Sequence, residues 1–397
     1  MIDGFSQVEV RRSRTVGEGG PGRVVWAAAL VACSLVVGVV SGANAQPRDA
    51  RKPGSAIDTQ RIEGDAVLAL ADAAMGGQKP ANSPDLTLGW QNAFLKAQQG
   101  TFVPFTLAVN TTGVLPDAVL VYVRAVKRGT PAATTSAPGR GRGPERTPER
   151  RSGEVAAVTT YPVDAIFPVE LTPGGAHVVR VRRGFSIAPG DYDVYVVVRE
   201  RPRSVVSAAS PRSAVLAQRL TVPDFWNGQL TTSSIMLADR LTVLPAPLSA
   251  DELIERPYVI GQNEIVPAED DRFQRGEELV VVFLVYNPAV TVEKRFDVQV
   301  EYHFFRKGIA GKAGGEPTDA HPPARDGERY FNHTDPQRFN PAVMGERFDP
   351  SGGQPVLAGQ GVPLSAFDAG DYRLAITVTD MISGTSVTRD VAFTVGS

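Results

Sequence analysis

Cysteine is almost absent from this chain, because Cys33 is the only one among 397 residues. A single cysteine excludes a disulfide framework and any zinc site built from cysteine thiolates. An excess of charge of one sign is lacking too, since 41 Lys and Arg stand against 43 Asp and Glu, a formal net charge of -2. Binding of nucleic acid requires a basic excess, so we expect no nucleic-acid partner.

The motifs of common catalytic and cofactor-binding sites are also missing. The sequence contains no Gly-x-Ser-x-Gly nucleophile elbow, no P-loop and no dinucleotide-binding glycine motif. Its four histidines are not spaced as metal-ligand pairs. We therefore expect no enzymatic activity, no cofactor and no metal. One catalytic alternative stays open, because paired carboxylates need no fixed spacing: a carbohydrate-active enzyme that uses Glu328 and Asp335.

The composition that is present is typical of a folded, turn-rich protein. Hydrophobic residues make up 42% and charged residues 21%, which are ordinary values for a globular chain. The 39 glycines and 31 prolines together reach about 18% of the residues, above the usual value of about 12%. This surplus favours a β protein with many turns.

An uncharged apolar run at residues 24–40 follows several arginines, the last of which is Arg23. The sequence Ala43-Asn44-Ala45 comes shortly after it. A basic start, an apolar core and an Ala-x-Ala end predict a secretory signal peptide over 1–45, cleaved before Gln46. We therefore expect a periplasmic or extracellular protein.

Two alternatives to cleavage involve the membrane. If the apolar run stays attached, it would anchor the protein in a bilayer. Residues 30–33 also resemble a bacterial lipobox, in which Cys33 would be acylated and become the new N-terminus. We expect contact with a membrane only in these two cases.

The mature chain is predicted to be mostly β, with two tandem immunoglobulin-like antiparallel β-sandwiches and a short N-terminal helix. Residues 46–84 form a flexible lead with the helix over 65–75, and the sandwiches cover 85–224 and 225–397. Residues 90–97 are expected to form a helical turn or an irregular edge. Strands are predicted where valine and aromatic residues alternate with polar ones or run together: 102–109, 118–126, 178–182, 192–198, 216–222, 279–286, 296–305, 372–379 and 391–395.

An internal repeat supports this division into two domains. The Gly-Asp-Tyr sequence that ends at Tyr192 recurs at Tyr372, and a basic turn that ends at Gly129 recurs at Gly308. The copies lie about 180 residues apart, as expected if one unit was duplicated. A long insertion follows the basic turn in each copy.

The two insertions differ in composition. Residues 130–153 are rich in Pro, Gly and Arg, so we predict that they are disordered and expose Arg140 and Arg142. Residues 309–354 contain several aromatic side chains, so we predict that they fold onto the second domain.

Three segments resemble modules that flank von Willebrand A-related domains in secreted bacterial proteins: 102–107 (FVPFTL), 230–234 (LTTSS) and 370–374 (GDYRL). The resemblance implies an exported protein with immunoglobulin-like modules. The chain has no Asp-x-Ser-x-Ser metal motif, so the resemblance implies neither an A domain nor any catalytic residue. The Gly-Asp-Tyr elements also resemble the corner of immunoglobulin-like sandwiches, where Tyr192 and Tyr372 would bond to nearby backbone.

The remaining candidates are surface features. The aromatic pair at the predicted domain junction is either an exposed anchor for a partner or a wedge buried between the sandwiches. The candidate binding residues are Phe225, Trp226, Tyr330, Phe331, His333, Arg140 and Arg142. We expect a non-catalytic binding or scaffolding protein of the cell envelope, with an envelope protein or a glycan as partner. The alternatives are the carbohydrate-active enzyme and a membrane-tethered accessory subunit.

Overall fold

The structure, a computed structural model, describes residues 54–80, 82–98, 100–112, 117–129, 133–135, 158–171, 177–201, 210–308, 322–345 and 347–396. The expected signal peptide lies outside these residues, and so do Cys33, Arg140 and Arg142. Within the described ranges, no helix is both long enough and apolar enough to cross a membrane.

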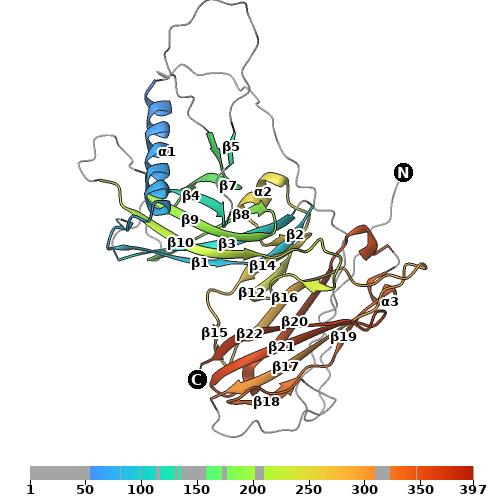
Figure 1. The fold of residues 1–397 in the computed structure, drawn as a ribbon. Helices are drawn as coiled ribbons and strands as arrows, with labels where there is room; N and C mark the ends of the chain where they lie inside the picture. The colour runs from blue at the N-terminus through green and yellow to red at the C-terminus, as the bar shows by residue number, and fades with distance from the viewer. Residues whose placement is uncertain are drawn as a thin grey trace, which may run out of the picture.

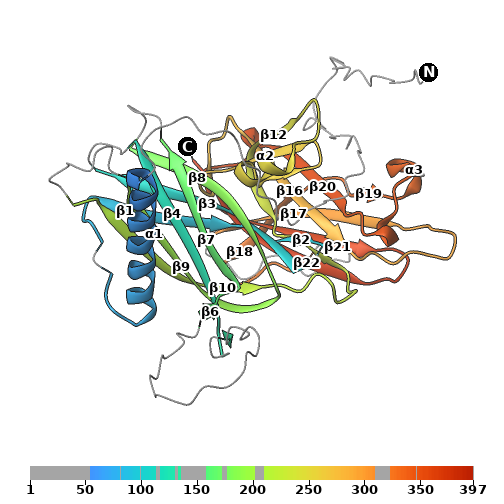
Figure 2. The same ribbon diagram turned by 90° about the horizontal axis from the view of Figure 1, so that it is seen from above.

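The described chain opens with α1 (Gly54–Met75), which begins well before the helix predicted over 65–75. Pro53 precedes α1 in the sequence and so does not interrupt it. Val67 and Ala71 of α1 are fully buried against the outside of the first sandwich (Figures 1 and 2). Packing against the sandwich stabilises the helix. A prediction from local sequence alone does not include this packing, so it gave a shorter helix.

The first sandwich consists of sheets A and B. Sheet A has β1 (Leu86–Asn92) and β2 (Leu95–Ala97) along one edge of β3 (Gly100–Thr111), and β8 (Val178–Ile187) along the other edge. Sheet B has the order β10 (Ser213–Val222), β9 (Gly190–Glu200), β4 (Ala118–Lys127), β7 (Val163–Glu170). Trp90 stacks on Phe105 at 4.2 Å between ring centroids, so the start of the segment 90–97 is strand and not a helical turn.

The second sandwich consists of sheets D and E. In sheet D, β11 (Thr231–Thr232) and β12 (Met236–Val243) lie along one edge of β16 (Glu278–Tyr286), and β20 (Val356–Pro363) lies along the other. Beyond β12 come β14 (Asn263–Pro267) and β13 (Val259–Ile260). Sheet E has the order β15 (Arg272–Phe273), β22 (Ser386–Val395), β21 (Gly370–Asp380), β17 (Val298–Lys307), β18 (Glu328–His333), with β19 (Gln337–Phe339) also paired to β17. Short helices connect the strands: α2 (Ala250–Glu255), α3 (Pro341–Met344), η1 (Pro350–Gly352) and η2 (Leu364–Ala366).

The two sandwiches repeat one strand order. The order β10-β9-β4-β7 in sheet B corresponds to β22-β21-β17-β18 in sheet E, and β3 with its neighbours corresponds to β16 with its neighbours. Each sandwich buries alternate residues of its strands in a core of its own. The protein is therefore mostly β, with two tandem immunoglobulin-like antiparallel β-sandwiches preceded by a helix (Figure 1). Within the described chain, β15 with β22 is the one parallel pair.

The Gly-Asp-Tyr elements form the same corner in both copies. Tyr192 donates its hydroxyl hydrogen to the carbonyl oxygen of Ala188 at 2.9 Å, and Tyr372 donates to that of Asp368 at 2.8 Å. Both tyrosines are buried. The glycine that begins each element has a positive φ, 142° for Gly190 and 151° for Gly370, in the region that favours glycine. This geometry is the tyrosine-corner hydrogen bond of immunoglobulin-like sandwiches.

A short β-ribbon has its first strand in the first insertion. β5 (Ala133–Thr135) lies inside 130–153, for which we expected disorder, and it pairs with β6 (Val158–Thr160). Both segments are rich in β-branched residues, which favour strands, and this local preference corrects the expectation for β5. The rest of that insertion lies outside the described residues. In the second insertion, Phe339 and Met344 are buried in the core of the second sandwich.

Candidate functional site

The aromatic pair at the domain junction contains one buried and one exposed side chain. Phe225 is 2% exposed and packs on Tyr286, with 5.0 Å between ring centroids, in an apolar cluster to which both sandwiches contribute. Phe225 is therefore a wedge between the domains, and its inclusion among the binding residues was wrong. Trp226 is 53% exposed, donates its indole N–H to Gly100 O at 3.2 Å, and lies under the Lys96 ammonium.

Sheet E has a polar face that points away from the core. On β21, residues 374, 376 and 378 are buried in the core, and residues 373, 375, 377 and 379 therefore point outward. The same alternation applies to β17 and β22, because the strands pair in register. We use the name sheet E outer face for these outward-pointing residues, of which His303, Phe305 and Arg373 are buried: Glu301, His303, Phe305, Tyr330, His333, Arg373, Thr377, Thr379, Ser386, Thr388 and Asp390.

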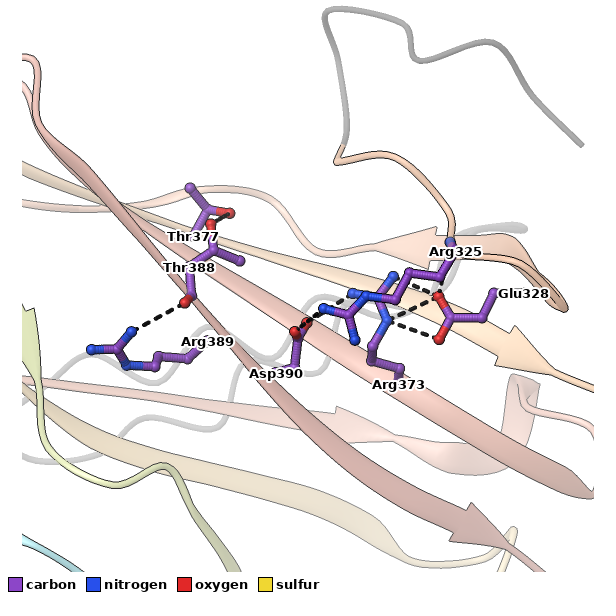
Figure 3. Close-up of polar contacts among 7 residues, drawn as sticks. All are labelled: Arg325, Glu328, Arg373, Thr377, Thr388, Arg389 and Asp390. Carbon is purple, nitrogen blue, oxygen red and sulfur yellow. Dashed lines mark hydrogen bonds and ion pairs between the residues drawn. The ribbon is translucent and has the colours of Figure 1, made fainter. Parts of the chain in front are cut away.

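Arg373 is the centre of an ion cluster on the sheet E outer face (Figure 3). Its Nε donates to both carboxylate oxygens of Glu328 at 2.9 Å, and its Nη1 donates to Asp390 at 2.8 Å. Arg325 pairs with the other oxygen of Asp390, and its backbone N–H donates to Glu328 at 3.2 Å. The Arg373 guanidinium lies 4.1 Å from the ring centroid of Phe305. The cluster thus joins β18, and the turn before it, to β21 and β22.

The carboxylates of this cluster are held in the ionised form. Burial opposes ionisation of Glu328, but hydrogen bonds from Arg373 and from the Arg325 backbone outweigh burial and lower the pKa of Glu328. Burial likewise opposes ionisation of Asp390, but hydrogen bonds from Arg373 and Arg325 outweigh it and lower the pKa of Asp390. A general acid must be protonated near the working pH. An ionised Glu328 would suit the base or nucleophile of a carboxylate pair and not its general acid.

We expect acid to weaken the second sandwich through this cluster. Because the pKa values of Glu328 and Asp390 are lowered in the folded state, the unfolded state binds more protons at low pH. The stabilisation is present above their ordinary pKa values of about 4, and it is lost as the pH falls through the lower folded values. Denaturant unfolding of wild type between about pH 6 and about pH 3 measures this loss. In the Glu328→Gln variant, the free energy of unfolding should fall less steeply with decreasing pH than in wild type. Equal slopes in the two proteins would contradict a stabilising role of the ionised Glu328.

The two sides of β18 face different surroundings. Phe331 packs against Phe367, with 4.7 Å between ring centroids, at the edge of the core, and is partly buried there. Tyr330 and His333 lie on the sheet E outer face, where the Tyr330 hydroxyl is 2.8 Å from His333 Nδ1. His303 is buried directly opposite His333 in the strand register. Among the described residues, no group of three or more His, Cys, Asp and Glu could hold a metal ion.

Hydroxyl groups cover the part of the sheet E outer face beyond the ion cluster. The Thr377 and Thr388 hydroxyls are 3.2 Å apart, and those of Thr379 and Ser386 are 2.9 Å apart (Figure 3 shows the first pair). Ser386 and Thr388 are exposed. Each hydroxyl can both donate and accept, so the pairs retain hydrogen-bonding capacity for a partner.

The corresponding face of the first sandwich is covered by α1, through an apolar cluster and through the ion pair of Arg124 with Asp72. Arg124 also pairs with Asp164 of sheet B. Leu120, Tyr122, Val197 and Val215 of sheet B form a buried cluster with α1. The corresponding strands of sheet E carry threonines and charged residues, and among the helices that the structure describes none packs on them (Figures 1 and 2). The outer face of sheet B therefore packs against α1, whereas no described helix packs against the outer face of sheet E.

The repeated sandwiches define the class of protein by fold. No family model matches the chain, and no curated protein matches it. Escherichia coli alpha-2-macroglobulin activated by porcine elastase is 11% identical, with a TM-score of 0.20, over 81% of this chain and 24% of that chain. Red sea bream transglutaminase is 10% identical, with a TM-score of 0.19, over 87% of this chain and 34% of that chain. Similarity this low carries no argument about this chain.

Proposed function

We propose that this chain is an exported, non-catalytic binding or scaffolding protein of the cell envelope. In this proposal, the sheet E outer face binds an envelope protein or a glycan. The observation that carries it is the difference between the two copies, because α1 covers the first face whereas none of the described helices covers the second, which has two pairs of hydroxyl groups. Immunoglobulin-like sandwiches bind partners through exposed sheet faces, edges and loops.

Two features of the sequence support export. Residues 1–45 have the pattern of a secretory signal peptide, and several segments resemble modules of secreted bacterial proteins. The proposal therefore expects a mature protein that begins at Gln46. Intact mass of the protein recovered from the envelope measures this, and a mass that includes residues 24–40 would instead support the membrane-tethered alternative.

Affinity purification of the full chain from the native envelope fraction tests the binding face. Wild type should recover a reproducible protein or glycan partner, and the double variant Thr377→Arg/Thr388→Arg should recover at least about tenfold less. The reason is steric and electrostatic, because two long cations would cover the hydroxyl rows without entering the core.

The matched control places the same change on another sheet. Thr242 is exposed on β12 of sheet D, so Thr242→Arg should leave recovery of the partner unchanged. Both variants should melt within a few degrees of wild type, since exposed substitutions change stability by about 0.5 kcal/mol or less. Equal recovery by wild type and the double variant would rule out the sheet E outer face as the binding surface.

A further inference from the structure

The edge strand β10 of the first sandwich is only partly covered. Its backbone pairs with β9 on one side, and on the other side the N–H groups of Ser213 and Val215 point away from β9. Ser83 Oγ accepts from Ser213 at 3.1 Å, and Asn82 Oδ1 accepts from Val215 at 2.8 Å. The direction of the backbone groups alternates along a strand, so those of residues 217, 219 and 221 also point outward. The described residues make no hydrogen bond to these outward groups.

The side chain of Asn82 acts here like the backbone of a neighbouring strand. Its Oδ1 accepts from Val215 N–H, and its Nδ2 donates to Val215 O at 3.3 Å. The backbone N–H of Ser83 donates to Ser213 O at 2.8 Å. The chain thus pairs with the first two outward positions of β10 and leaves the next three open.

The second sandwich covers the end of the corresponding edge with its own chain. β15 pairs in parallel with the end of β22, where Thr394 N–H donates to Asp271 O at 2.7 Å and Gly396 N–H donates to Phe273 O at 2.7 Å. The end of this edge strand is therefore covered by β15 in the second copy, whereas the described residues leave the end of β10 open.

A cavity lies beside this open edge. It has a volume of about 340 Å³ and is lined by Leu86 and Leu88 of β1, by Val215 and Leu216 of β10, and by the Asn82 segment. Residues directly opposite each other in an antiparallel pair place their side chains on the same face. A strand added to β10 would therefore direct the side chain opposite Leu216 toward this cavity.

The charge of Arg219 limits which polypeptides can pair with β10. It lies in the middle of the open segment, is exposed, and forms no ion pair within the described residues. Two copies of β10 paired antiparallel over 217–221 would place their Arg219 side chains directly opposite each other, and like charges in that position destabilise a sheet. An acidic residue at that position in a different polypeptide would instead be favourable.

We propose that β10 binds an extended segment of another polypeptide, which adds a strand to sheet B along residues 216–222. The segment has an acidic residue opposite Arg219 and an apolar residue opposite Leu216 that enters the cavity. Main-chain hydrogen bonds supply affinity in this mode of recognition, and the cavity and Arg219 supply specificity. The site lies on the first sandwich and does not depend on the sheet E outer face.

Selection from a phage-displayed library of random peptides of about 12 residues, with the full chain as bait, tests the proposal. The enriched peptides should combine an acidic residue with a nearby apolar one. Synthetic copies should bind Arg219→Pro at least about tenfold more weakly, because proline lacks the outward N–H but spares the bonds to β9.

Two further variants keep the test valid if proline disturbs the fold. Arg219→Glu should weaken the acidic peptides and strengthen versions with lysine, and Leu216→Trp should fill the cavity and weaken all of them. Arg240→Glu, which changes an exposed arginine on β12, is the matched control and should have no effect. The proposal is overturned if no peptide is enriched, or if enriched peptides bind wild type, Arg219→Glu and Leu216→Trp equally.

Discussion

Replacement of Arg373 by alanine is expected to lower the free energy of unfolding of the second sandwich by about 3–5 kcal/mol. Arg373 is 4% exposed and holds Glu328, which is itself 7% exposed, so the variant would leave a buried carboxylate without its counter-ion. It would also remove the cation that stacks on Phe305. Chemical denaturation of the full chain at neutral pH measures the loss.

The matched control uses the second arginine that binds Asp390. The Arg325 side chain is 61% exposed, so Arg325→Ala should cost at most about 1 kcal/mol, the usual value of an exposed ion pair. The double variant Arg373→Met/Glu328→Met should recover part of the loss, because apolar side chains can replace a buried ion pair. If Arg373→Ala and Arg325→Ala have equally small effects, the cluster does not stabilise β18 on sheet E.

Phe225→Ala is the second variant with a large expected effect, a loss of about 3–5 kcal/mol. Phe225 fills the cluster between the sandwiches and packs on Tyr286, so its truncation would leave a cavity at the domain junction. The loss should appear in calorimetry as a lower melting temperature and as separation of the unfolding of the two sandwiches.

Trp226→Ala is the control, because it changes the adjacent residue of the same pair. Trp226 is 53% exposed, and its removal should cost about 1 kcal/mol or less, the value of one exposed hydrogen bond and cation–π contact. A larger loss of unfolding free energy for Trp226→Ala than for Phe225→Ala would contradict our assignment of Phe225 as the buried wedge.

The architecture could be predicted from the sequence where local patterns determine it. The runs at 279–286 and 372–379 became β16 and β21, because their apolar residues face a core. β7 and β20 were not predicted. Pro168 interrupts the pattern of β7, although an edge strand tolerates proline, and glycines dilute the apolar residues of β20.

The contacts of the candidate site depend on register, which a sequence pattern does not determine. Arg373 and Glu328 are 45 residues apart in sequence and meet only because β17 lies between β18 and β21. The polar residues at 373, 377 and 379 were the one available signal, since they indicate that one face of β21 is not core. The sequence likewise could not tell which member of the Phe225-Trp226 pair is buried, because both are large aromatic residues.

Photo-crosslinking in the native host tests the proposed function most directly. A photoreactive phenylalanine analogue placed at the exposed position Thr388 lies on the sheet E outer face, and the same analogue at Thr242 lies on sheet D. The proposal predicts a discrete adduct with an envelope protein or glycan at position 388 that is absent at position 242, on a chain that begins at Gln46. No adduct at position 388, or the same adducts at both positions, would contradict it.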